Sequence, residues 1–169
     1  MFWFIYHLPL HVVIIAIIVS VFGWGAIMTW LKNKSEKSVR IINIILAVVS
    51  FCGIIGMAVY RHSKGVYENC FIPFYSFVKA KEQKEMYRTM LMNVFLFVPF
   101  GITVPFAITR KKHSAKKKDI VLTTILIAAL VSVSIEAHQY FFSMGRCEID
   151  DMLCNTFGAI LGTFTFWLY

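Results

Sequence analysis

Charged side chains that could bind a ligand gather toward the C-terminal end of the chain. A span of sixteen residues contains Glu136, Arg146, Glu148, Asp150 and Asp151. A guanidinium fork binds phosphate or carboxylate through parallel hydrogen bonds, and carboxylates accept hydrogen bonds from cationic and hydroxyl groups. These residue types at this spacing therefore indicate a site for the polar head of a ligand.

The same carboxylates are also hard oxygen ligands, which suit a divalent cation. With His138 or a carboxylate as general base, a bound cation would support transfer or hydrolysis. Ser134 and Ser143 lie in no nucleophile-elbow or Ser-x-x-Lys pattern. We therefore take ligand binding as the first hypothesis, a membrane-embedded enzyme as the alternative and a structural or partner-docking role as the third. The sequence assigns no metal site and no cofactor.

The composition determines where such a site must lie. Of 169 residues, 59% are hydrophobic and only 15% are charged, with a mean hydropathy of +0.70. Soluble domains carry about 25% charged residues, so this chain is expected to be a membrane protein rather than a water-soluble enzyme. Its 27 aromatic residues, with nine glycines and four prolines, exclude a disordered or collagen-like chain.

Uncharged segments predict an all-α, polytopic bundle of five transmembrane helices. Each is close in length to the ~20 residues that a helix needs to cross a bilayer, provided that the fourth continues through Glu136. The five uncharged segments are 1–31, 41–60, 90–109, 120–135 and 152–169. We interpret the first as an anchor and not a signal peptide, because no basic residue precedes it and no small-residue cleavage site follows.

The basic residues of the loops predict the orientation. Five spans place loops 32–40 and 110–119 on one face, with ten Lys and Arg against two acidic residues. That face is expected to be cytoplasmic, with the N-terminus outside and the C-terminus inside. The charges of loops 61–89 and 141–151 and Glu136 sum to zero, so the net charge of +8 lies inside. Topology and anionic lipids account for these lysines, and we expect no nucleic-acid partner.

Polar residues from three spans are expected to meet near the outer surface. At ~1.5 Å per residue, Glu136 lies about 6 Å below the outer edge of the hydrocarbon core, and Asn93 and Asn155 lie about 5 Å below it. Such groups turn toward protein or a water-filled cavity. Gln139 shares a helix face with Glu136, and Asp150 or Asp151 is placed to cap the last helix. The predicted binding residues are Asn93, Glu136, Gln139, Arg146, Glu148, Asp150, Asp151 and Asn155.

Other residues predict how the elements pack. Gly158 and Gly162 form a small-xxx-small pair that lets another helix approach closely, while Pro99, Gly101 and Pro105 interrupt the third span. Residues 70–78 are expected to form a strand-like or re-entrant segment, and 79–88 an exposed short helix. Cys70 and Cys147 both fall in outward loops, where a disulfide is topologically possible.

These motifs resemble the VanZ-like family of small bacterial membrane proteins. The resemblance rests on Asn93-x-x-x-Phe97-x-Pro99-x-Gly101, Glu136-x-x-Gln139 and Arg146-x-x-x-Asp150-Asp151-x-x-x-Asn155-x-x-Gly158, preceded by Ile72-Pro73-Phe74. It covers about Tyr60 to Gly162. Two departures are Glu148, where the family more often has Asp, and Cys70, where it usually has Asn.

The resemblance implies a multi-pass protein of the bacterial cell membrane that is linked to resistance against glycopeptide antibiotics of the teicoplanin type. Residues 41–169 would be the VanZ-like domain of four transmembrane helices, and residues 1–40 an anchoring helix with a basic cytoplasmic loop. An outward polar pocket would then bind an amphiphile among membrane lipids, either a lipid-linked cell-wall precursor or a lipoglycopeptide. Pro73, Phe74, Pro99, Gly101, Gly158 and Gly162 would be structural members of the motif.

Overall fold

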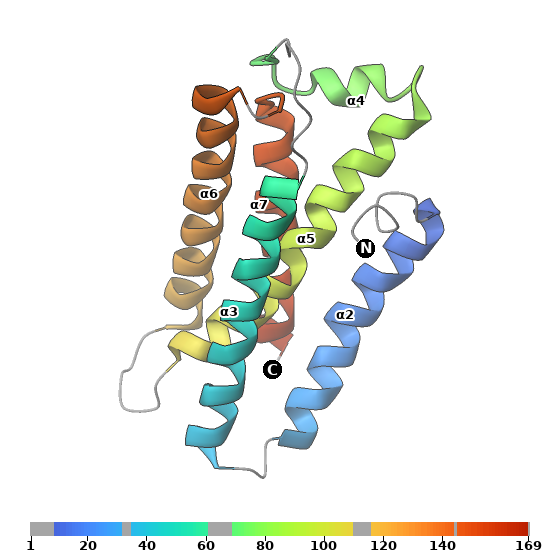
Figure 1. Ribbon diagram of the computed structural model, residues 1–169. Coiled ribbons are helices and arrows are strands. Elements are labelled where there is room, and N and C mark those ends of the chain that lie inside the picture. Colours follow the sequence, from blue (N-terminus) through green and yellow to red (C-terminus); the bar gives the residue numbers. More distant parts are fainter. Residues whose placement is uncertain (1–8, 32–34, 61–68, 110–115, 144, 169) are drawn as a thin grey trace.

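The computed structural model describes residues 9–31, 35–60, 69–109, 116–143 and 145–168. In these ranges, all regular structure is helical except for one isolated β-bridge. The helices are α2 (Leu10–Leu31), α3 (Glu36–Tyr60), α4 (Tyr75–Lys79), α5 (Lys84–Ile108), α6 (Lys117–Phe142) and α7 (Ile149–Leu168). Figure 1 shows the five long helices as one bundle, with the short α4 lying across one end.

Four helices of the described chain are long and apolar enough to cross a membrane, and they make it a multi-pass membrane protein. The spans are Leu10–Met28, Lys37–Met57, Met86–Ile108 and Lys117–Phe142. The helix α7 runs beside α5 and begins with two acidic residues. The predicted all-helical class is confirmed for these residues, whereas the fifth span and the orientation of the termini stay predictions.

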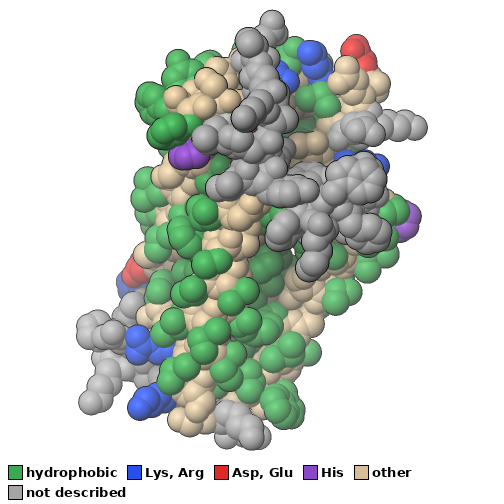
Figure 2. Space-filling view, in the orientation of Figure 1, with side chains coloured by type: hydrophobic (Ala, Val, Ile, Leu, Met, Phe, Trp, Pro, Cys, Tyr) green, Lys and Arg blue, Asp and Glu red, His purple; other side chains and the backbone are tan. Residues whose placement is uncertain are grey.

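Apolar side chains dominate the outer surface of the bundle. Large hydrophobic residues of α2 and α3 are exposed along these helices, and Figure 2 shows hydrophobic side chains over the middle of the visible face. Such a continuous apolar surface is suited to lipid. Figure 1 places the last turns of α2 and α5 and the first turns of α3 and α6 at one end, opposite α4.

The central helix is α5, which contacts all the other helices. Phe97 and Val98 are completely buried there. The tightest contact is with α7: a Cβ atom built on Gly158 would overlap the carbonyl oxygen of Val94, and one on Gly162 would overlap that of Val98. On α5, a Cβ atom at Gly101 would overlap the backbone of Ala159. Glycine at these positions lets the two backbones touch.

The segment before α5 differs from the sequence prediction. Residues 75–79 form the short helix α4, and Cys70 forms only an isolated bridge with Glu148. The expected exposed helix at 79–88 does not form, because α5 already begins at Lys84. The charged residues before Met90 thus extend the third predicted span by more than one turn.

Candidate functional site at the α4 end

Asp150 joins the first turn of α7 to the turn that precedes α4. The backbone N–H of Phe74 donates to its Oδ1 and that of Ser76 to its Oδ2, each at 2.6 Å. Phe74 has φ 64°, in the left-handed region that bulky residues rarely adopt. Of the two residues predicted to cap α7, Asp150 instead directs its carboxylate to the start of α4, and the capping role of Asp151 stays a prediction. Pro73 and Phe74 lie in the turn held in this way.

Glu148 lies between α4 and the α6–α7 connection. The hydroxyl of Ser76 donates to Glu148 Oε2 at 2.8 Å, and Arg146 Nε lies 3.2 Å from Glu148 Oε1 as an ion pair. The guanidinium carbon of Arg146 is 5.9 Å from the ring centroid of Tyr75. Two charged side chains from one connection thus reach the same short helix.

Glu136 and Gln139 connect α6 to this network. Glu136 is buried, and its Oε2 accepts the backbone N–H of Glu148 at 3.0 Å. With its amide oriented to match its neighbours, Gln139 donates to Glu136 Oε2 and to the carbonyl oxygen of Arg146, both at 3.2 Å. The predicted residues Glu136, Gln139, Arg146, Glu148 and Asp150 therefore form one hydrogen-bonded network, which we call the rim network.

The remaining predicted residues are buried nearby on α5 and α7. Asp151 occupies the first turn of α7, and Asn93 lies on α5 one residue before Val94, which faces Gly158. The amide of Asn155 donates to Ser132 Oγ at 2.9 Å, which links α7 to α6. Ser132 lies one turn before Glu136 on the buried face of α6, so Asn155 contacts α6 next to the rim network. The convergence of all eight predicted residues on one ligand stays a prediction.

Ser132 was missed by the sequence reasoning, although a signal was present. The buried face of α6 repeats every four residues, and after Ile120 it consists of small or polar side chains. Its members are Thr124, Ala128, Ser132 and Glu136. A helix with such a stripe packs closely against a neighbour, which here is α7.

Cys70 and Cys147 lie in adjacent backbone segments, and both are free thiols. Cys70 donates its N–H to the carbonyl of Cys147 at 2.9 Å, and Ile149 donates to the carbonyl of Cys70 at 3.2 Å. In this parallel register Cys70 is paired with Glu148, so the side chain of Cys147 points to the other face. Burial raises the pKa of the Cys147 thiol to about 11. The possible disulfide is not formed.

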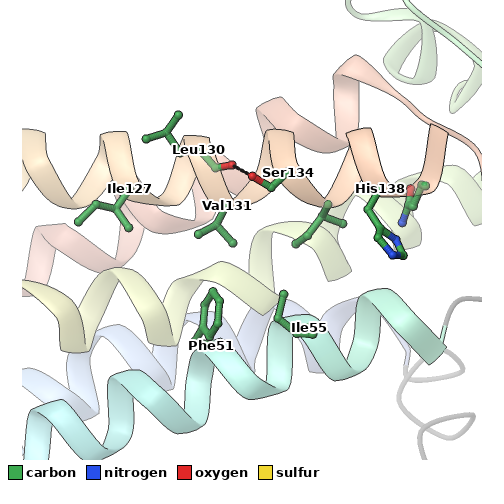
Figure 3. Close-up of a pocket in the computed structure, with 9 residues that line it drawn as sticks. Phe51, Ile55, Ile127, Leu130, Val131, Ser134 and His138 are labelled. Atoms are coloured by element: carbon green, nitrogen blue, oxygen red, sulfur yellow. Dashed lines mark hydrogen bonds between the residues drawn. The ribbon is translucent and has the colours of Figure 1, made fainter. Parts of the chain in front are cut away.

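A groove between α3 and α6 leads toward the rim network, and it was not anticipated from the sequence. It has a volume of about 400 Å³ and is apolar for most of its length, with polar side chains toward its end near the rim network. Figure 3 shows His138 pointing from α6 toward α3. Gln139, also at this end, belongs to both the groove and the rim network. The lining residues are Phe51, Ile55, Ile127, Leu130, Val131, Ser134, Ile135, His138 and Gln139.

The donors present do not form a metal centre in the described part of the chain, where no group of three or more His, Cys, Asp or Glu side chains is arranged to hold an ion. The acidic oxygens with known partners instead accept hydrogen bonds or pair with arginine. The hypothesis of a metal-dependent enzyme consequently has no candidate centre among these residues. The arrangement favours a polar rim beside an apolar groove.

Comparison with known proteins identifies relatives of this chain. The family model described as VanZ/LLP1 matches residues 10–169. Protein VanZ of Enterococcus faecium is 30% identical over 77 residues, which are 45% of this chain and 42% of that protein. The matched segment thus spans less than half of that relative. No solved structure matches the chain. The family match begins at residue 10, so α2 lies within it, contrary to the expectation that the resemblance starts near Tyr60.

Proposed function

Because the chain belongs to the VanZ/LLP1 family, we propose that it binds an amphiphile at the α4 end of the bundle. The apolar chain of the ligand would lie in the groove between α3 and α6, and its polar head would contact the rim network. The ligand class would be a lipid-linked envelope precursor or a lipoglycopeptide. Binding such a molecule in the bacterial cell membrane would account for a link to teicoplanin-type resistance without any chemical step.

The position of Gln139 is the observation that supports this proposal most. Its side chain lines the apolar groove, and its amide also donates to Glu136 and to the carbonyl of Arg146. A ligand in the groove would therefore reach the rim network without crossing a packed helix. Ligand sites are typically apolar clefts with a few converging polar groups, and this groove has that character.

Ser134 offers a direct test, because it is exposed in the groove and its hydroxyl donates only to the carbonyl of Leu130 on its own helix. Ser134→Phe would fill the groove with an aromatic ring. We expect it to weaken binding of a lipoglycopeptide to the purified protein at least about tenfold, or ~1.4 kcal/mol, measured by native mass spectrometry in neutral detergent.

Val133→Phe is the matched control, because Val133 is half-exposed on the same helix and lies outside the groove. It should bind the probe like the wild type. In a teicoplanin-susceptible bacterium, the wild type and Val133→Phe should raise the inhibitory concentration, whereas Ser134→Phe should not. Equal binding by both variants would contradict the groove as the ligand site.

A further inference from the structure

Two cationic side chains approach the same tyrosine at the α4 end. Lys79 Nζ lies 4.7 Å from the ring centroid of Tyr75, and the guanidinium carbon of Arg146 lies 5.9 Å from it. Tyr75 and Lys79 are one turn apart on α4, whereas Arg146 comes from the connection between α6 and α7. Cation–π attraction accounts for each contact separately. It does not account for two like charges around one ring.

Both cations retain capacity for a further partner. A hydrogen bond with Tyr75 raises the pKa of Lys79 in spite of the opposing effect of Arg146, so the ammonium stays charged. The buried Nε of Arg146 is held in the ion pair with Glu148, whereas 30% of the Arg146 side chain is exposed and accessible to a further partner. An anion between the two side chains would reduce their mutual repulsion and accept their hydrogen bonds.

The acidic side chains of the rim network lie close to this position, but they are buried or already have partners. Asp150 and Glu136 are buried and accept backbone N–H groups. Glu148 has only 15% of its side chain exposed and is held between Ser76 and Arg146, whereas Arg146 is 30% exposed. Glu82 is exposed in the turn after α4 and forms no ion pair with Lys79 among the described residues. Among the described residues, the more exposed charged side chains beside Tyr75 are therefore the two cations.

We infer that the amphiphile has an anionic head, of the phosphate class, which Lys79 and Arg146 bind beside Tyr75. This inference rests on the proposed function, because it names the head of the ligand whose chain lies in the groove. Gln139 connects the two parts, since it lines the groove and bonds to the backbone of Arg146. Arg146 would bind two phosphate oxygens, and Lys79 would act as a point charge.

The test compares three probes on the purified full-length protein in neutral detergent. Lysophosphatidic acid has the phosphate and an acyl chain, a monoacylglycerol with the same chain lacks the phosphate, and inorganic phosphate lacks the chain. We expect lysophosphatidic acid to bind about tenfold more tightly than the monoacylglycerol, with inorganic phosphate weaker than either. Affinities are measured by native mass spectrometry and thermal shift.

Lys79→Gln should remove most of this preference and leave binding of the monoacylglycerol unchanged. The matched control is Lys81→Gln. It removes the same charge from an exposed side chain two residues further along the chain, and it should behave like the wild type. Suppose that both lipids bind equally well, that Lys79→Gln does not change their affinities and that Ser134→Phe abolishes binding. This result would overturn the anionic head and leave the proposed function intact. If neither lipid binds but the lipoglycopeptide still binds the wild type and not Ser134→Phe, only the anionic head is overturned. If none of the three amphiphiles binds, both proposals fail. Tight binding of inorganic phosphate that Lys79→Gln abolishes would support the anion site and contradict the amphiphile.

Discussion

At the scale of single residues, the main role of the acidic side chains is to hold the backbone of the rim network in place, and contact with a ligand is secondary. The two oxygens of the Asp150 carboxylate accept the backbone N–H groups of Phe74 and Ser76, on either side of Tyr75. Hydrogen bonds to a charged acceptor contribute about 1.5–3 kcal/mol. They also hold Phe74 in a left-handed conformation that a bulky side chain disfavours. Asp150 is therefore a positioning residue for α4 and, through it, for Tyr75 and Lys79.

Asp150→Asn is expected to destabilise the protein by about 1–3 kcal/mol, because an amide has one acceptor oxygen and would turn its own N–H groups toward a backbone donor. Thermal unfolding in detergent without ligand measures the effect. Glu82→Gln, at an exposed position, should leave the unfolding midpoint unchanged. If Asp150→Asn unfolds at the wild-type temperature, the carboxylate does not hold α4 as described.

At the scale of elements, glycines on α5 and α7 set the distance between the helices that carry much of the site. The helix α7 positions Asp150 and Asp151, and α5 begins just after α4. Gly158 and Gly162 lie directly against backbone atoms of α5, with no space for a side chain. In a bilayer, association depends on such close packing, because lipid tails are as apolar as the helices.

Gly158→Ala should strongly destabilise the bundle, because its Cβ atom would overlap the carbonyl oxygen of Val94 and push α7 from α5. The matched control is Gly53→Ala in α3, where a Cβ atom would have no neighbour within 4 Å. That change should be neutral or stabilise the helix by up to about 1 kcal/mol, since alanine has the higher helix propensity. Unfolding midpoints of the two variants measure the difference, and equal midpoints would show that α5 and α7 do not depend on this contact.

At the scale of the whole molecule, successive long helices run in opposite directions, so the lysine-rich segment and the rim network lie at opposite ends. The end where α5 leads into α6 carries Lys116, Lys117 and Lys118, and the other carries α4 and the rim network. The excess of Lys and Arg predicts that the first end faces the cytoplasm. The proposed ligand site would then face the outer leaflet, where an antibiotic or envelope precursor is accessible.

Cysteine labelling on intact cells tests this orientation. A membrane-impermeant maleimide should label Ser143→Cys at the α4 end and should label Lys116→Cys only after the cells are opened. The native thiol at 147 should react slowly near neutral pH and faster as pH rises toward 11, because burial raises its pKa and lowers the thiolate fraction. The reverse labelling pattern would place the lysine-rich end outside.

The sequence by itself determined the class of protein, the five long helices and the composition of the two ends, but not the short helix α4. Uncharged segments and basic loops are local properties of the sequence, whereas the depth of Glu136 in the bilayer stays a prediction. The glycine pair likewise indicated a close helix contact before its partner was known.

Only the tertiary structure decided which groups meet. Asp150 binds N–H groups 76 and 74 residues away, and the pairing of Cys70 with Glu148 separates the two thiols. The groove exists because α3 and α6 leave a space between the side chains that line it. Such relations depend on the rotation of each helix about its axis and on packing between distant segments, which no local pattern contains.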